Sequence, residues 1–178
     1  MIIGLTGYAQ SGKDTLANIL VKKFGYTRVA FADPIRELLY EMNPSVKDGG
    51  YRVQGVVDGY GWDFAKNAFP EIRTLLQNLG VGAREVFGEG FWVQQALRKV
   101  HFEGNYVITD VRFTNEADAI CKYDNAQIWR VRRPGIGAVN LHESETQMDG
   151  YKVDQIFLNA GTVEDLEALL TTRMRAYV

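Results

Sequence analysis

The sequence has little cysteine and no long apolar segment. Cys121 is the single cysteine among 178 residues, so the chain cannot form an internal disulfide. The apolar N-terminus is only a few residues long and lacks the regions of a signal peptide. No stretch approaches the ~20 apolar residues of a membrane span. We therefore expect a protein of the reducing cytoplasm without a membrane partner. Cys121 follows Ala119 and Ile120 in a predicted helix, which favours a buried thiol.

Neither sign of charge is in marked excess. The chain carries 20 Lys and Arg against 22 Asp and Glu, a formal net charge of −2. Such a balance provides no general basic field, so we expect no nucleic-acid partner. The two histidines form no His-x-x-x-His metal pair, and the Gly-x-Ser-x-Gly motif of serine hydrolases is absent. With 46% hydrophobic residues, the chain suits one compact domain over residues 1–178.

Short apolar segments alternate with amphipathic ones along the chain. The apolar segments predict five strands, at residues 2–6, 27–32, 105–109, 127–132 and 153–158. The amphipathic segments predict helices at residues 13–24, from 34, 70–79, 91–102, 114–123 and from 162. This alternation is typical of an α/β fold with a parallel five-stranded sheet. Two segments without a period, 43–62 and 134–152, are predicted to be irregular excursions at strand ends, where ligands bind in such folds.

A phosphate-binding loop is predicted between the first strand and the first helix. Residues 7–13 match the Gly-x-x-x-x-Gly-Lys pattern in the required strand–loop–helix context. The two glycines let the backbone fold round an anion with its N–H groups pointing inward, and the helix N-terminus adds partial positive charge. The lysine would reach the β- and γ-phosphates of ATP. The residues of this loop that are predicted to bind ATP are Gly7, Ala9, Gln10, Ser11, Gly12 and Lys13, followed by Asp14 and Thr15.

The residues after the loop lysine depart from the general pattern. Asp14 stands where Ser or Thr normally contacts Mg²⁺, and Thr15 follows. Asp14 could hold the metal through a water, Thr15 could supply the missing hydroxyl, or Asp14 could only favour the first helical turn through its charge. Asp110, at the end of the third predicted strand, is a further metal candidate, with a cap or turn aspartate as the alternative. ATP and Mg²⁺ are the predicted cofactors.

Arginines gather at the predicted strand ends and in the adjoining segments. They are Arg36, Arg73, Arg84, Arg112, Arg130, Arg132 and Arg133. Guanidinium groups match phosphate oxygens and offset charge on a transferring phosphoryl group. A solvated surface charge is the alternative for each, and it is favoured for Arg130, which lies within a strand. Jointly the arginines indicate a phosphorylated acceptor, which attacks without a general base because its phosphate is already ionised.

Three other residues are candidates for binding this acceptor. Gln77 lies one helical turn after Arg73 and shares its face. Asp33, at the end of the second predicted strand, could contact the acceptor or serve the local turn. Trp92 could stack on an acceptor base, or it could belong to the core.

Seven motifs follow one another along nearly the whole chain. They are residues 7–15, 31–36, 73–80 with Arg84, 109–116, 132–134, 142–145 and 159–162. In this combination they resemble the deoxynucleoside monophosphate kinases of tailed bacteriophages, in which a Lys-Asp-Thr triplet like residues 13–15 is usual. The resemblance implies a three-layer P-loop kinase fold, with an acceptor-binding region at about 34–102 and a lid at about 133–152.

The resemblance also implies roles for residues. The acceptor nucleotide would face Arg36, Arg73, Gln77 and Arg112, and His142 and Glu145 would lie in the lid. Arg132 and Arg133 would hinge into the lid, and Arg132 would also contact ATP. The adenine would be bordered by Asn159, Gly161 and Thr162. The expected catalytic residues are Lys13, Asp110, Arg112, Arg132 and Arg133. A homodimer and a viral origin, with function in the host cytoplasm, are further implications.

Two other functions also fit the phosphate-binding loop. A kinase of another small phosphorylated acceptor, of the dephospho-coenzyme A or phosphomevalonate type, would share the lysine and the arginines. A nucleotide-dependent regulatory switch would bind a partner protein and would not need the acceptor-side arginines. Turnover on a panel of deoxynucleoside monophosphates separates these alternatives.

Overall fold

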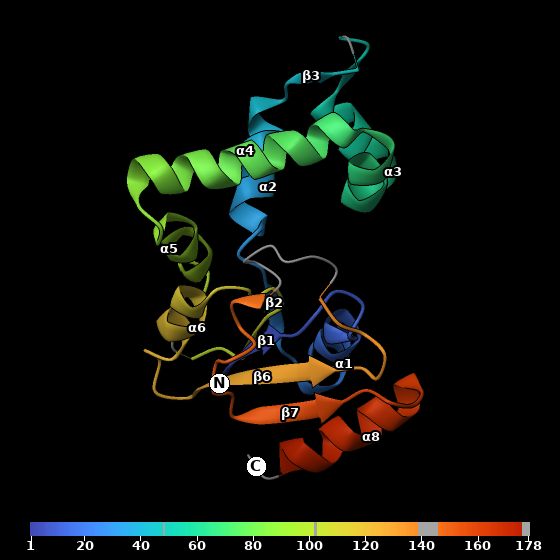
Figure 1. The fold of residues 1–178 in the computed structure, drawn as a ribbon, viewed down its shortest axis with the longest axis vertical. Coiled ribbons are helices and arrows are strands. Elements are labelled where there is room, and N and C mark those ends of the chain that lie inside the picture. Colours follow the sequence, from blue (N-terminus) through green and yellow to red (C-terminus); the bar gives the residue numbers. More distant parts are fainter. Residues whose placement is uncertain (48, 102, 139–145, 176–178) are drawn as a thin grey trace. The chain divides into compact units, whose positions relative to one another are not determined.

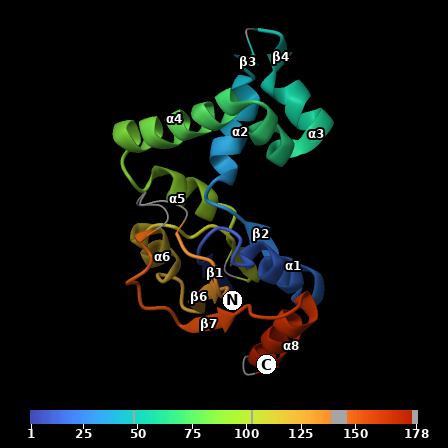
Figure 2. The ribbon, with the colours of Figure 1, turned by 45° about the vertical axis from the view of Figure 1, so that its right-hand side comes forward.

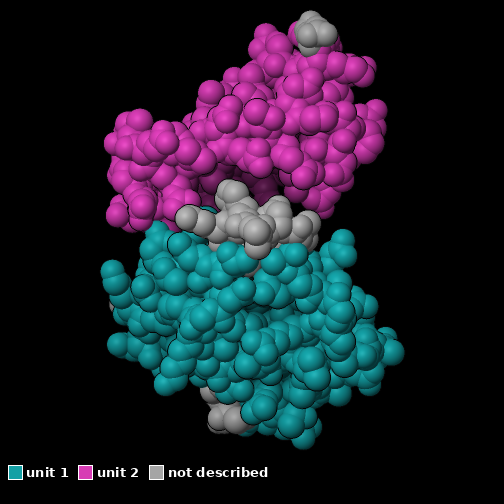
Figure 3. Space-filling model, viewed as in Figure 1, with its two compact units in different colours: residues 1–30, 99–178 teal, residues 31–98 magenta. Residues whose placement is uncertain are grey.

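The computed structural model describes residues 1–47, 49–101, 103–138 and 146–175, which form two compact units. Unit 1 combines Met1–Ala30 with Lys99–Val178, and unit 2 is Phe31–Arg98; Figure 3 colours them separately. The range of unit 2 is close to that expected for the acceptor-binding region. Among the described residues, none of the helices is both long and apolar enough to span a membrane.

Unit 1 is built on a parallel five-stranded sheet, which confirms the predicted fold class (Figure 1). Its strands are β1 (Ile2–Thr6), β2 (Thr27–Val29), β5 (Tyr106–Ile108), β6 (Ala126–Arg132) and β7 (Gln155–Leu158). Their order is β2-β5-β1-β6-β7, and every neighbouring pair is parallel. Strand β2 ends three residues earlier than predicted.

Strand β1 lies at the centre of this sheet, and all five of its residues are buried. From β1 the chain crosses to β2 at one edge, whereas the later strands β6 and β7 lie on the other side of β1. The carboxyl end of β1 is therefore the point where the direction of strand order reverses. In open α/β sheets this is where ligands bind, and residues 7–12 follow β1 directly.

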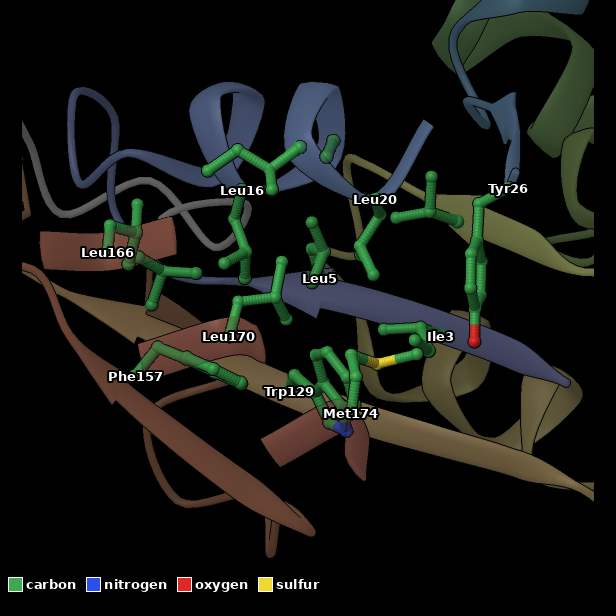
Figure 4. Close-up of a cluster of buried hydrophobic side chains, with 14 residues drawn as sticks. Ile3, Leu5, Leu16, Leu20, Tyr26, Trp129, Phe157, Leu166, Leu170 and Met174 are labelled. Atoms are coloured by element: carbon green, nitrogen blue, oxygen red, sulfur yellow. The ribbon is translucent and has the colours of Figure 1, made fainter. Parts of the chain in front are cut away.

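One face of the sheet is covered by helices α1 (Lys13–Phe24) and α8 (Val163–Met174), which lie side by side (Figures 1 and 2). Leu16 and Leu20 from α1 meet Leu170 from α8 over Leu5 of β1 (Figure 4). Trp129 of β6 and Phe157 of β7 extend this cluster, with ring centroids 5.0 Å apart. Burial of this apolar area fixes both helices on the sheet.

The opposite face is covered by α6 (Thr114–Ile120). A Cβ atom on Gly4 of β1 would lie 2.8 Å from Cδ1 of Ile128 and 2.9 Å from Cδ1 of Ile120. The absence of a side chain at Gly4 thus lets α6 approach the central strand closely. Helices on both faces of the sheet give the three-layer arrangement that was expected.

Unit 2 is mainly helical and has its own core. Its elements are α2 (Asp33–Met42), β3 (Ser45–Val46), β4 (Tyr51–Arg52), α3 (Val53–Ala68), α4 (Pro70–Phe87) and α5 (Phe91–Leu97). Strands β3 and β4 pair in antiparallel fashion. Leu39, Val53, Ala65 and Ile72 are fully buried in one apolar cluster. This cluster joins α2, α3 and α4.

The prediction that residues 43–62 lack regular structure was wrong. The segment contains the hairpin of β3 and β4 and more than half of α3. Val53 and Val56 are buried one helical turn apart, and Ala65 is buried beyond the kink. The glycines of this segment conceal the helical period in the sequence. Gly61, with φ of 79°, kinks the helix. Helix α4 also runs past the predicted end at residue 79, through Gly80, to Phe87.

The expected burial of Cys121 was also wrong. Helix α6 ends at Ile120, which takes the buried position, and Cys121 is exposed as its C-cap residue. Its Sγ atom lies 3.8 Å from the hydroxyl oxygen of Tyr151. Helix α5 likewise ends at Leu97, before the predicted residue 102.

Candidate active site

The phosphate-binding loop joins β1 to α1 and takes its shape from two glycines. Gly7 and Gly12 have φ of 136° and 103°, values that favour glycine. A Cβ atom would lie 2.3 Å from the carbonyl oxygen of Val131 at Gly7, and 2.3 Å from Nδ2 of Asn159 at Gly12. Both positions therefore need glycine for conformation and for space. Gln10 also has a positive φ, of 63°.

The loop presents hydrogen-bond donors to an anion. Helix α1 begins at Lys13, and its N-cap residue Gly12 supplies no side-chain cap. The N-terminus of a helix favours an anion through its backbone N–H groups and its dipole. Lys13 Nζ donates to the carbonyl oxygens of Gly7 and Tyr8 at 2.6 and 2.7 Å, which holds the ammonium over the loop. Ser11 is 1% exposed, and its hydroxyl has no hydrogen-bond partner within the described part of the chain. This is the local chemistry of a phosphate site.

A cavity of about 430 Å³ opens beside the loop, within unit 1. Its described lining comes from the loop, from the segment after β5, from β6 and the residues after it, from residues 148–149 and from the end of β7. The lining combines one lysine with four arginines: Lys13, Arg112, Arg130, Arg132 and Arg133. Of the other predicted ATP ligands, Gly7, Ala9 and Ser11 also line it. The structure thus brings the loop and these four arginines to one cavity.

The four arginines have different environments. Arg132 and Arg133 are exposed at the end of β6, and Arg112 is exposed after β5, where its backbone N–H donates to Glu116 at 2.7 Å. Arg130 is only 9% exposed, and its guanidinium donates to the carbonyl oxygens of Met148, Asp149 and Tyr151. Burial lowers the pKa of Arg130 from its usual value. The prediction that Arg130 is a solvated surface charge is therefore wrong. Arg130 is buried because it lies on β6, an inner strand of the sheet.

The metal candidates are near cavity-lining residues in the sequence but do not themselves line the cavity. Asp14 is exposed in the first turn of α1, Thr15 is half-buried one residue later, and Asp110 is half-buried two residues after β5. In the described ranges, no group of three or more His, Cys, Asp or Glu side chains could hold a metal ion.

The segment after β7 is tied to the loop and to its own helix. Asn159 Nδ2 donates to the carbonyl oxygen of Ser11 at 3.0 Å. Thr162 is the N-cap of α8 and forms a capping box with Asp165, as predicted. A Cβ atom on Gly161 would lie 2.3 Å from Oδ2 of Asp165. The three residues expected beside adenine thus belong to a tightly built turn.

The acceptor-side candidates of unit 2 lie on α2, α4 and α5. Arg36 Nη1 pairs with Asp33 Oδ1 at 3.0 Å in the first turn of α2. Arg73 Nη2 donates to Asn67 Oδ1 at 3.2 Å, and the side chain of Gln77 is exposed one turn further along α4. Arg84 is half-buried near the end of α4. Trp92 is 6% exposed, and its indole N–H donates to the carbonyl oxygen of Gly80 at 3.0 Å, which favours packing over base stacking.

Two residues of the cavity escaped the sequence analysis. The Tyr8 hydroxyl donates to Asp149 Oδ1 at 2.8 Å, and this hydrogen bond, with burial, raises the pKa of Tyr8. Tyr8 occupies a variable position of the loop pattern, and Asp149 lies in a segment without a period. No sequence pattern therefore marked either residue as part of a site. The lid candidates His142 and Glu145 lie outside the described residues.

The parallel sheet, the loop after β1 and the cationic cavity define a P-loop phosphotransferase of the three-layer α/β class. A family model described as deoxynucleotide monophosphate kinase matches residues 62–170. The chain belongs to this family, and it is thus a kinase that acts on a deoxynucleoside monophosphate.

The chain is also similar to individual proteins. A protein of Acanthamoeba polyphaga mimivirus named "Putative deoxynucleotide monophosphate kinase" is 28% identical over an alignment that covers 93% of this chain and 91% of the relative. Uncharacterized protein ORF76 of Ictalurid herpesvirus 1 is 26% identical over 98% of this chain and 67% of its own length. Among solved structures, shikimate kinase from Aquifex aeolicus matches with a TM-score of 0.53 at 13% identity, over 99% of this chain and 98% of that one. The last comparison supports the fold alone.

Proposed function

We propose that this chain makes deoxynucleoside diphosphates by transferring the γ-phosphate of ATP to a deoxynucleoside 5′-monophosphate, and that transfer takes place in the cavity of unit 1. The observation that carries this proposal is the gathering of Lys13 with Arg112, Arg132 and Arg133 around one cavity. A phosphate-binding loop alone suits any nucleotide. The additional guanidinium groups suit a second phosphate and the charge on a transferring phosphoryl group.

The described lining of the cavity favours catalysis by positioning and charge. Its only carboxylate is Asp149, which already accepts a hydrogen bond from Tyr8, and it contains no histidine. The monophosphate of a nucleotide is anionic at neutral pH, so its oxygen attacks without first losing a proton to a base. Lys13 would hold the β- and γ-phosphates, and the arginines would stabilise the charge as it moves between oxygens.

Mg²⁺ fits this site as an ion that arrives with ATP. It commonly binds through one or two carboxylates, several waters and substrate phosphates, without a cage of protein ligands. The described residues contain no such cage, which supports this mode. Asp14, Thr15 and Asp110 are the residues that would hold the ion or its waters. When bound, Mg²⁺ would neutralise part of the phosphate charge.

We assign acceptor binding to Arg112, to Asp33 at the start of α2 and to individual side chains of the region at about 34–102. The exposed Arg73 and Gln77 share a face of α4, as contact with one ligand requires. Arg36 has its guanidinium fixed by Asp33. Arg84 and Trp92 are the remaining candidates, and Trp92 would act through packing.

Asn159, Gly161 and Thr162 would border the adenine, and residues 133–152 would form a lid with Arg132 and Arg133 at its hinge. We also propose that the protein is a homodimer, that it acts in the host cytoplasm and that it comes from a bacteriophage. The two viral relatives support a viral origin in general.

The decisive experiment is a steady-state panel of the four deoxynucleoside monophosphates with ATP and Mg²⁺. Dephospho-coenzyme A and phosphomevalonate serve as alternative acceptors, and ATP without acceptor measures hydrolysis. We expect diphosphate formation from at least one monophosphate and none with Lys13→Ala prepared in parallel. Turnover restricted to another acceptor, or ATP hydrolysis alone, would overturn the proposal.

A further inference from the structure

The second residue of the phosphate-binding loop is bonded to a distant segment. The Tyr8 hydroxyl donates to Oδ1 of Asp149 at 2.8 Å, although the two residues lie 141 positions apart in the sequence. Both side chains line the cavity of unit 1. The pKa of Tyr8 is raised mainly by this hydrogen bond, which fits a phenol that stays protonated and donates.

The segment that carries Asp149 is anchored by a buried arginine. Arg130, 9% exposed, donates from Nη1 to the carbonyl oxygen of Asp149 at 3.1 Å and from Nη2 to that of Tyr151 at 3.2 Å. Nη2 also donates to the carbonyl oxygen of Met148, whose side chain is 5% exposed. At least three of the five guanidinium N–H groups therefore bind backbone. This fixes the position from which Asp149 reaches Tyr8.

Tyr8 in turn holds the loop lysine. Its carbonyl oxygen accepts from Lys13 Nζ at 2.7 Å and from the backbone N–H of Ser11 at 3.2 Å. A continuous set of contacts thus runs from Arg130 through Asp149 and Tyr8 to Lys13. All four side chains line the same cavity.

We propose that Arg130, Asp149 and Tyr8 are positioning residues that hold the phosphate-binding loop in the shape that receives the phosphates of ATP. Arg130 acts through the backbone of residues 148–151. It clamps that segment in position and does not itself bind phosphate. This inference rests on the proposed function of the loop as the ATP site.

The test is a double-mutant cycle on ATP affinity, measured by calorimetry with the full chain and without acceptor. Because the hydrogen bond joins a phenol to a carboxylate, Tyr8→Phe and Asp149→Ala should each weaken ATP binding about 3- to 10-fold. The double variant should bind ATP no more weakly than the single variant with the lower ATP affinity, since both substitutions remove the same hydrogen bond. Asp149→Asn, which keeps an acceptor oxygen, should restore binding to within about 2-fold of the native value.

The chain offers a matched control pair in unit 2. The Tyr40 hydroxyl donates to Asp58 Oδ1, also at 2.8 Å and also exposed. Tyr40→Phe and Asp58→Ala should leave ATP affinity unchanged, because neither residue lines the cavity. Unchanged affinity in the Tyr8 and Asp149 variants, or additive losses in their cycle, would overturn the inference.

Arg130→Lys extends the cycle, because it keeps the charge but cannot span three carbonyls. Combined with Tyr8→Phe, it should again weaken ATP binding no further than the weaker single variant. Additive losses of ATP affinity would show that Arg130 binds phosphate directly, and they would overturn its proposed role as a clamp. If Arg130→Lys fails to fold, the Tyr8–Asp149 cycle decides by itself.

The two proposals fail in different ways. If the native chain binds ATP but phosphorylates none of the monophosphates, the proposed function fails while the cycle still supports the clamp. If turnover is normal and the cycle shows no coupling, only the clamp fails.

Discussion

The side-chain amide of Asn159 donates a hydrogen bond to the backbone carbonyl of Ser11 at 3.0 Å. The backbone N–H of the same residue donates to the carbonyl oxygen of Arg132 at 2.7 Å. Asn159 therefore joins the phosphate-binding loop to the ends of β6 and β7. Its amide also occupies the space beside Gly12 that a side chain there would need.

Replacing Asn159 by alanine should weaken ATP binding about 10-fold, because the loop carbonyl loses a partly buried donor. The KM for the monophosphate should stay within about 2-fold, since the lost bond lies on the donor side. Calorimetry with ATP and steady-state kinetics measure the two effects. Asn18→Ala, at an exposed position of α1, is the control. Native ATP affinity in Asn159→Ala would contradict this role.

Gly12→Ala should lower the free energy of unfolding and abolish measurable ATP binding. The positive φ alone costs about 1–2 kcal/mol for alanine, and the new Cβ atom would also meet the Asn159 amide at 2.3 Å. Gly25→Ala separates the two causes, because Gly25 has φ of 69° and nothing within 4 Å of the added Cβ. Urea unfolding should show the larger loss for Gly12→Ala. Equal losses would mean that the contact with Asn159 is unimportant.

The sheet of unit 1 was predictable because its signals are local. Strand β1 is a short apolar run followed by a glycine-containing loop, and α1 ends at a glycine. Unit 2 was less predictable, since the helix α3 carries glycines that conceal its period and is stabilised by contacts with α2 and α4. Tertiary burial of Val53 and Ala65 there outweighs a weak helix propensity.

The loop between β1 and α1 could be predicted from one motif, whereas the contacts that shape it could not. Gly7, Gly12 and Lys13 follow a spacing with a physical reason. Asp149 follows no such spacing, and it reaches Tyr8 only because Arg130 binds the backbone around it. Long-range pairs of this kind depend on the folded geometry, which a single sequence does not reveal.

Arg112→Lys should lower kcat about 10- to 100-fold, because a point charge cannot replace a planar fork on a phosphate. Arg112 lines the cavity after β5 and is exposed to a ligand there. Arg173→Lys, at an exposed position of α8, is the matched control and should keep native turnover. Steady-state kinetics with saturating ATP and monophosphate measure both variants. A near-native kcat in Arg112→Lys would contradict a catalytic role for Arg112.

Lys13→Ala should lower kcat at least ~100-fold, because it removes the cation that we propose holds the β- and γ-phosphates. Its ammonium donates to the loop carbonyls of Gly7 and Tyr8, and Lys13 is only half-buried, so we expect its removal to cost little stability. Thermal melting should therefore stay within a few degrees of native. Lys22→Ala, at an exposed position in the last turn of the same helix, controls for loss of a positive charge. A native rate in Lys13→Ala would refute the phosphate site, whereas a large fall in melting temperature would assign the lysine a structural role instead.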